Sequence, residues 1–200
     1  ARMRHAGLAA VRAAQESGTL VSYDLNLRPA LWSVDDAVKT LTSMDKAPDI
    51  VFASDDEAAL LFGDTTPEAV ADRFLGRGAQ IVVAKQGAKG ALLATENKRV
   101  PLPPAPSTPV DASGAGDSFA GAFLAWYIET GAAEFAAHKA AGVAAVMGSG
   151  LGAVEPIPRR QSFSPLTCSL SPWSNARTAF RCISLKAGRP LRRYWRARST

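Results

Sequence analysis

Short apolar runs that alternate with helical segments are the feature that most restricts the fold of this chain. Residues 81–84 form a continuous apolar run, as expected for a strand buried on both faces of a sheet. Residues 49–53 have the same character, and residues 20–23 form a shorter strand. Such alternation predicts an α/β fold of three layers, with a mostly parallel central sheet between two layers of helices.

Local signals mark where the helices begin. Ser54 is followed by acidic residues suited to a first helical turn, and Pro67 follows Thr66 at the start of another helix. Glu96 and Asn97 lie between two apolar segments and indicate a hairpin of residues 91–94 and 98–102. We expect helices at 2–17, at 35–44, from Ser54, from Thr66 to Leu75, from Phe119 to Ile128, and at about 132–147.

Charge divides the chain into an acidic body and a basic end. Ten of the 23 Lys and Arg residues lie after residue 155 and no Asp or Glu does, so residues 1–155 carry a net charge of −5. The arginines of residues 161–200 follow no helical stripe, and this segment has no apolar periodicity. We therefore interpret residues 161–200 as a disordered or non-native tail, as from translation in another reading frame, in preference to a nucleic-acid-binding segment.

Several classes of protein are disfavoured by composition. No apolar run reaches the ~18 residues that a membrane span needs, and the first residues lack the apolar core of a secretion signal. Both cysteines lie in the basic end, and His5 and His138 do not form a zinc motif. We expect a cytoplasmic protein that binds neither membranes nor nucleic acid.

The residues with the clearest chemical potential lie in a loop of small residues, 111–121, that leads into an apolar helix. The backbone N–H groups of Ala115, Gly116 and Asp117 would lie at a helix N-terminus, which favours an anion. Asp117 would repel a bound phosphate, but it could remove a proton from a substrate hydroxyl while the amides stabilise a transferred phosphoryl group. Taken alone, the sequence supports this interpretation and simple helix capping by Asp117 about equally.

Other nucleotide-binding motifs are not matched. The chain has no Gly-x-x-x-x-Gly-Lys-Ser/Thr loop, and the glycines of residues 148–152 follow a helical segment and not a strand. They are typical of a helix end. Neither Ser113 nor Ser118 has a suitable histidine partner for a hydrolase.

Residues 110–124, Val-Asp-Ala-Ser-Gly-Ala-Gly-Asp-Ser-Phe-Ala-Gly-Ala-Phe-Leu, closely resemble the C-terminal signature of the ribokinase-like (PfkB) carbohydrate kinases. The similarity extends over about residues 1–160. It implies a ribokinase-like fold and ATP-dependent phosphorylation of a sugar hydroxyl, with Mg²⁺ as cofactor. It further implies that Asp117 is the catalytic base and that Gly114, Ala115 and Gly116 form the anion hole with it.

Two further segments resemble nucleotide-binding parts of the family. The segment from Ser54 to Glu57 is similar to the Asn-x-x-Glu of these kinases, which implies that Glu57 helps to organise magnesium and phosphates; the same residues can also cap a helix. The turn after residue 84 resembles the nucleotide-side turn, which implies ATP-binding roles for Lys85, Gly87 and Gly90.

The family also provides a possible ion site. In many relatives, the residues at the positions of Asp111 and Ser113 hold a monovalent cation, so the resemblance suggests K⁺ beside the anion hole.

The segment of residues 23–32 bears on the substrate. It resembles the Asp-x-Asn-x-Arg-x-x-Leu-Trp segment of 2-keto-3-deoxygluconate kinases and of some fructokinases, which implies substrate-binding roles for Asp24, Asn26 and Arg28. An arginine can bind the carboxylate of an acid sugar with two hydrogen bonds. Arg28 could instead bond a nearby carboxylate such as Asp24. The leading hypothesis is a 2-keto-3-deoxygluconate kinase, and a fructokinase or another sugar kinase of the family is the alternative.

The resemblance covers only the C-terminal part of such a kinase, residues 1–160. The N-terminal half of the family's fold and its lid over the sugar are not seen before Ala1. Because a lid excludes water and positions the hydroxyl, we expect the 200-residue chain to be weakly active or to be an inactive nucleotide-binding fragment. Full-length relatives could form homo-oligomers.

Overall fold

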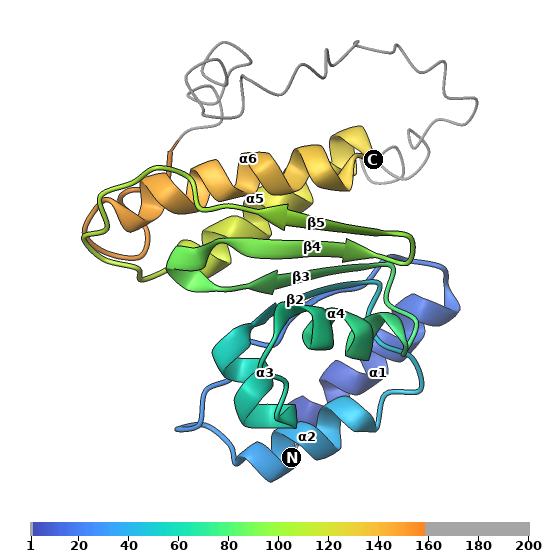
Figure 1. Cartoon of the computed structure of the whole chain (residues 1–200). Helices are drawn as coiled ribbons and strands as arrows, with labels where there is room; N and C mark the ends of the chain where they lie inside the picture. Colours follow the sequence, from blue (N-terminus) through green and yellow to red (C-terminus); the bar gives the residue numbers. More distant parts are fainter. Residues whose placement is uncertain (1, 159–200) are drawn as a thin grey trace, which may run out of the picture. The chain divides into compact units, whose positions relative to one another are not determined.

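The computed structural model describes residues 2–158, and the predicted tail of residues 161–200 lies outside the described residues. The described part contains a five-stranded sheet and six α-helices (Figure 1). The strands are β1 (Ser22–Asp24), β2 (Ile50–Ser54), β3 (Ile81–Lys85), β4 (Ala91–Thr95) and β5 (Lys98–Leu102). The α-helices are α1 (Arg2–Glu16), α2 (Val34–Thr42), α3 (Asp55–Phe62), α4 (Pro67–Leu75), α5 (Ala115–Thr130) and α6 (Ala133–Gly148).

The sheet has the strand order β1-β2-β3-β4-β5 and contains both kinds of pairing. β1, β2 and β3 are parallel, and β4 and β5 continue the sheet as an antiparallel hairpin. The sheet is therefore mixed, because the predicted hairpin at Glu96 and Asn97 lies in the same sheet as the parallel strands. Pro101 lies in β5, an edge strand, where a missing backbone donor is tolerated.

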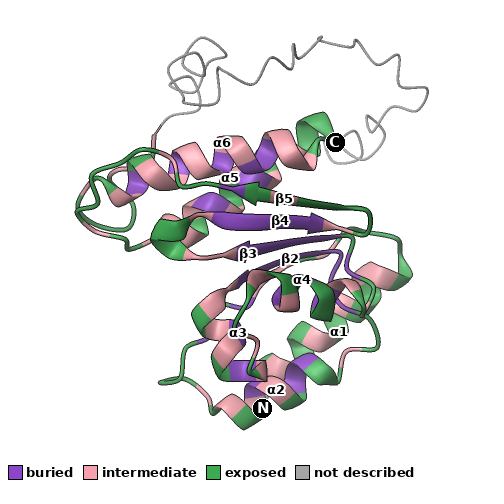
Figure 2. Cartoon of the chain, in the orientation of Figure 1, coloured by how far each residue is buried: buried purple, intermediate pink, exposed green. Residues whose placement is uncertain are grey.

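Alternate residues of the central strands contribute to two separate cores, which confirms the three-layer α/β/α prediction. Val51 and Val82 pack with α2, α3 and α4 on one face of the sheet. Phe52 and Val83 pack with α5 and α6 on the other. Figure 1 shows α1 on the same side as α2, and Figure 2 shows that β2, β3 and β4 are buried along most of their length.

Phe123 forms the centre of the core beneath α5. Its side chain is fully buried, and its ring lies edge-on to Phe52 at 5.4 Å between centroids and stacks on Tyr127 at 5.7 Å. These contacts fix α5 against β2. The position of the loop before α5 therefore depends on this packing.

Two predicted helix starts are confirmed by their caps. The Ser54 side chain accepts a hydrogen bond from the Glu57 amide, and Glu57 accepts one from the Ser54 amide, which makes a capping box. Thr66 caps α4, with Pro67 at its first position. α5 begins at Ala115, four residues before the predicted start, because Gly114 adopts a left-handed conformation and serves as its N-cap. None of the helices within residues 2–158 is long and apolar enough to cross a membrane.

Asp49 links the segments at the start of the parallel strands by hydrogen bonds. Its buried carboxylate accepts hydrogen bonds from the Val21 amide at 2.9 Å, from Lys46 at 3.2 Å and from Gln80 at 2.9 Å. Burial alone would raise the pKa of Asp49, but these hydrogen bonds and the Lys46 charge outweigh it and lower the pKa below 3.8. The ionised carboxylate is thus stabilised by the fold.

We expect Phe123→Ala to lower the free energy of unfolding by about 3–5 kcal/mol, because it leaves a cavity between α5 and the sheet. Ile128→Ala, on the same helix, is the control, because Ile128 is 70% exposed and should cost little. Urea denaturation measures both. Equal losses for the two variants would contradict the packing described here.

A second expectation concerns pH. Because the pKa of Asp49 is lowered, its contribution to stability is complete above 3.8 and is lost as the pH falls through the lowered value. Asp49→Asn should therefore destabilise the chain at pH 7, and its difference from the wild type should narrow below pH 3.8. Unfolding midpoints across this pH range test the assignment, and a difference independent of pH would refute it.

Candidate active site at the start of helix α5

The first turn of α5 is the centre of the candidate site. Asp117 is the third residue of the helix, and the N-cap is Gly114 with a φ of 75°. Within residues 2–158, no side chain makes a capping hydrogen bond at this end, so Asp117 does not cap the helix. Within residues 2–158, the N–H groups of Gly116 and Asp117 have no hydrogen-bond acceptor. The turn thus offers two free donors at the positive end of a helix dipole.

The C-terminal ends of the parallel strands lie beside this turn, at the left of Figure 1. Ser54 and Lys85 pair in register as the last residues of β2 and β3. A Cβ atom on Gly116 would lie 3.5 Å from the Lys85 ammonium nitrogen, so Lys85 reaches the first turn of α5. Residues from separate parts of the sequence are therefore gathered at one edge of the sheet.

Asp24 and Lys85 form an ion pair across these strand ends. Lys85 Nζ lies 2.8 Å from Asp24 Oδ2, and the side chains are 17% and 19% exposed. Burial raises the pKa of Asp24; the hydrogen bond and charge of Lys85 oppose this, and the charges of Glu57 and Asp117 add to it. The three carboxylates and one ammonium therefore form a single electrostatic cluster.

Glu57 has a structural role in addition to the predicted one. Its Oε2 accepts the Ser54 amide of the capping box, and its Oε1 accepts the Leu27 amide at 2.8 Å. The side chain thus joins the start of α3 to the loop after β1. The predicted contribution of Glu57 to ATP binding would have to use the remaining lone pairs of these oxygens.

Arg28 and Asn26 lie in the loop after β1 and are both exposed. Arg28 donates to the carbonyl of Leu27 at 3.1 Å, and it does not bond Asp24, which pairs with Lys85. The alternative of a structural Arg28–Asp24 pair is therefore wrong. Asn26 has a φ of 40°, in the left-handed region, and lies between the buried Leu25 and Leu27.

Asp111 ties the loop before α5 to the loop after α6. Its Oδ1 accepts the Ser113 amide at 2.9 Å, and its Oδ2 accepts the Gly152 amide at 3.0 Å. Hydrogen bonds from the Ser113 hydroxyl and from these two amides lower the pKa of Asp111. The close approach continues at Gly114, where a Cβ would lie 2.8 Å from the Ala153 carbonyl oxygen.

These two loops offer oxygen atoms of the kind that bind a monovalent cation. The carboxylate of Asp111 belongs to the loop before α5, and the carbonyl of Ala153, which approaches Gly114, belongs to the loop after α6. This donor set fits the predicted K⁺ site. By contrast, residues 2–158 contain no cluster of three or more His, Cys, Asp or Glu side chains that could hold a metal. A magnesium ion would need phosphate oxygens to complete its coordination.

The predicted catalytic residue borders a cavity. A hollow of about 410 Å³ has Asp117 and Gly114 in its wall, together with Ser118, Gly121, Ala122, Ala125, Trp126, Val143, Ala153, Ile157 and Pro158. The part of this wall formed by α6 and residues 153–158 was not predicted from the sequence. The run of small residues at 118, 121, 122 and 125 on one face of α5 was the available signal.

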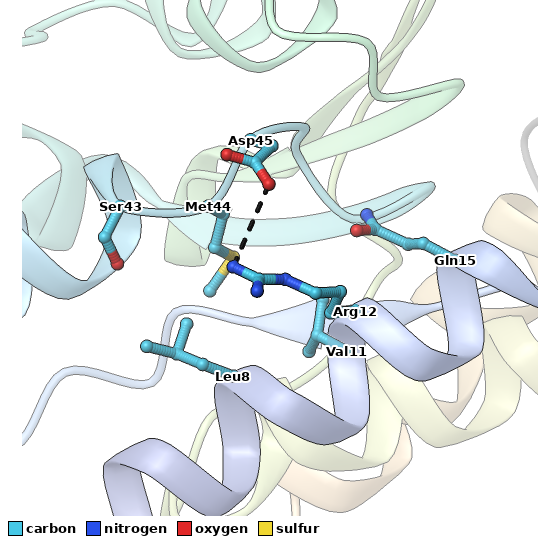
Figure 3. Close-up of a pocket in the computed structure, with 7 residues that line it drawn as sticks. All are labelled: Leu8, Val11, Arg12, Gln15, Ser43, Met44 and Asp45. Atoms are coloured by element: carbon cyan, nitrogen blue, oxygen red, sulfur yellow. Dashed lines mark ion pairs between the residues drawn. The ribbon is translucent and has the colours of Figure 1, made fainter.

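A second cavity, between α1 and the segment after α2, is far smaller, at about 40 Å³ (Figure 3). Arg12 and Asp45 form an exposed ion pair across it at 3.9 Å. None of the predicted site residues lines this cavity.

Comparison with known proteins agrees with this geometry. Residues 1–160 match the pfkB family of carbohydrate kinases, and the chain belongs to this family. Fructokinase-2 of Oryza sativa subsp. japonica is 37% identical over 123 residues, which are 60% of this chain and 37% of that protein. The 2-dehydro-3-deoxygluconokinase of Dickeya dadantii (strain 3937) is 31% identical over 155 residues, 75% of this chain and 50% of that protein.

Solved structures show the same fold. A double mutant of the fructokinase from Vibrio cholerae O395, in its fructose-, ADP- and potassium-ion-bound form, superposes with a TM-score of 0.71 at 29% identity. The match covers 80% of this chain and 54% of that one. The chain therefore has a ribokinase-like fold and spans about half or less of the length of these relatives.

Gly114→Ala should destabilise the chain by about 1–2 kcal/mol or more, because a side chain there is strained at a φ of 75° and meets the Ala153 carbonyl at 2.8 Å. Gly121→Ala is the matched control, since a Cβ there has open space and a helical backbone. It should be neutral or stabilising by about 0.5–1 kcal/mol. Thermal unfolding of the two variants measures the difference. A harmless Gly114→Ala would contradict the close contact of the two loops.

Proposed function

We propose that the protein containing this chain phosphorylates a hydroxyl group of a sugar or acid sugar with ATP. The observation that carries the proposal is the position of Asp117 beside the free amides of Gly116 and Asp117, at the wall of the 410 Å³ cavity. A carboxylate next to an anion-binding turn suits proton removal and phosphoryl stabilisation in one step.

Asp117 acts as the general base in this proposal. Its carboxylate accepts the proton of the sugar hydroxyl, and the oxygen so activated attacks the γ-phosphorus of ATP. The free amides of Gly116 and Asp117 stabilise the charge on the transferred group. The amide of Ala115, which was predicted to take part in the anion hole, donates to the Ala112 carbonyl at 3.2 Å instead. Lys85, Gly87 and Gly90 lie on the nucleotide side, and Glu57 helps to place the Mg²⁺ that accompanies ATP. Asp111 and Ser113 hold K⁺ beside the turn.

The substrate we favour is 2-keto-3-deoxygluconate. Arg28 is exposed, and within residues 2–158 its guanidinium donates only to the carbonyl of Leu27. Its remaining N–H donors are therefore available to bind a carboxylate with two hydrogen bonds. Asp24 and Asn26 lie on the same loop and strand end. Fructose is the second candidate, because the fructokinase matches have higher identity, 37% against 31%, over a shorter stretch.

The test is a phosphotransfer assay of the protein that contains this chain, with 2-keto-3-deoxygluconate and with fructose. Asp117→Asn should lower turnover about 10²–10⁴-fold with ATP binding largely kept, because it removes the base and leaves the amides. Arg28→Met should raise the KM for the acid sugar and leave that for fructose nearly unchanged, since only the acid sugar has a carboxylate.

Three results would count against parts of this proposal. Full turnover by Asp117→Asn would exclude Asp117 as the base. Equal effects of Arg28→Met on both sugars would exclude recognition of a carboxylate. ATP binding by the protein that contains this chain, without product from either sugar, would favour the alternative of a nucleotide-binding role without turnover.

A further inference from the structure

The ion pair of Asp24 and Lys85 is an unusual feature of the strand ends. The ammonium and carboxylate lie 2.8 Å apart and are more than four-fifths covered. A buried ion pair is costly to desolvate and contributes little net stability. A contribution to stability therefore does not account for this pair. Asp24 Oδ1 is also buried and has no hydrogen-bond partner within residues 2–158. The carboxylate of the pair is thus incompletely hydrogen-bonded within residues 2–158.

The ammonium of Lys85 lies at the N-terminal end of α5. It lies against Gly116, near enough that an added Cβ would be 3.5 Å away. A positive charge at the positive end of a helix is unfavourable unless an anion is close. Asp24 supplies one such anion, but a lysine has three N–H donors and Asp24 is the only acceptor found for them within residues 2–158. Donors therefore remain for a further anion.

The charges that act on Asp24 are those of Lys85, Glu57 and Asp117, and only Lys85 among them is positive. Without Lys85, the charges around a phosphate approaching Asp117 would all be negative. Lys85 also stands beside the free amides of Gly116 and Asp117, so an ammonium and two N–H groups can contact one phosphoryl group.

We infer that Lys85 binds the γ-phosphoryl group of ATP and that Asp24 is the positioning residue that holds Lys85 over the start of α5. This inference rests on the proposed kinase function. In the transfer step, a bond forms between the sugar oxygen and the γ-phosphorus as the bond from that phosphorus to the β–γ bridging oxygen breaks. ADP leaves with the electron pair, and the sugar proton passes to Asp117. Lys85 keeps its protons and donates hydrogen bonds to the non-bridging oxygens throughout.

The inference can be tested by binding alone. The chain is titrated with Mg²⁺ and either ADP or the β,γ-imido analogue of ATP, and Kd is measured for each. Lys85→Met should weaken binding of the analogue roughly tenfold more than binding of ADP, because only the analogue has a γ-phosphate. Lys89→Met is the matched control: Lys89 is an exposed lysine of the neighbouring turn η1 (Gly87–Lys89), and its loss should leave the ratio unchanged.

The role of Asp24 has its own test. Asp24→Asn should reduce the preference for the analogue, and adding it to Lys85→Met should cause no further loss, since both act through one ammonium. Additive losses would exclude the positioning role. Asp56→Asn is the control, because Asp56 is exposed on α3. Lys85→Arg keeps the charge and should keep most of the preference, even if Lys85→Met proves too unstable to measure.

The outcomes separate this inference from the proposed function. If the wild-type chain binds neither nucleotide, the kinase proposal itself fails. If it binds both, and Lys85→Met weakens binding of ADP and of the analogue equally, or Lys85→Arg loses the preference for the analogue although it keeps the charge, only the present inference fails.

Discussion

Burial of both faces of β2 and β3 is the constraint on which the rest of the structure depends. Because each of these strands contributes to two cores, helices must cover the sheet on both sides. On one side this requirement brings α5 against Phe52 and fixes where the helix begins. The first turn of α5 then lies beside Lys85, at the carboxyl ends of the parallel strands. Ligands commonly bind at this edge of such sheets.

Much of this fold could be predicted from the sequence because the signals were local. The apolar runs, the capping residues at Ser54 and Thr66 and the hairpin at Glu96 all depend on neighbouring residues, and all are confirmed. The start of α5 was placed four residues late, because a run of small residues has no apolar periodicity to mark it. Gly114 determines that start through its backbone conformation.

The residues of the site could be predicted from the sequence, but the contacts between them could not. Asp117 and the glycines were identified by their pattern, and the structure places them at a helix N-terminus beside a cavity. The pairing of Asp24 with Lys85 joins residues 61 positions apart, and the contact of Asp111 with Gly152 joins residues 41 apart. Only the fold brings such residues together. Their functional assignments therefore remain predictions that geometry supports.

The central claim is that the free backbone amides at the start of α5 bind a phosphate of ATP. Nuclear magnetic resonance of the backbone amides tests this claim most directly. When the ¹⁵N-labelled chain is titrated with ATP and Mg²⁺, the amide resonances of Gly116 and Asp117 should shift strongly, because free N–H groups acquire charged acceptors. The amide resonance of Gly63, at the end of α3, should not shift. Saturable ATP binding without a shift of the Gly116 and Asp117 amide resonances would contradict the account.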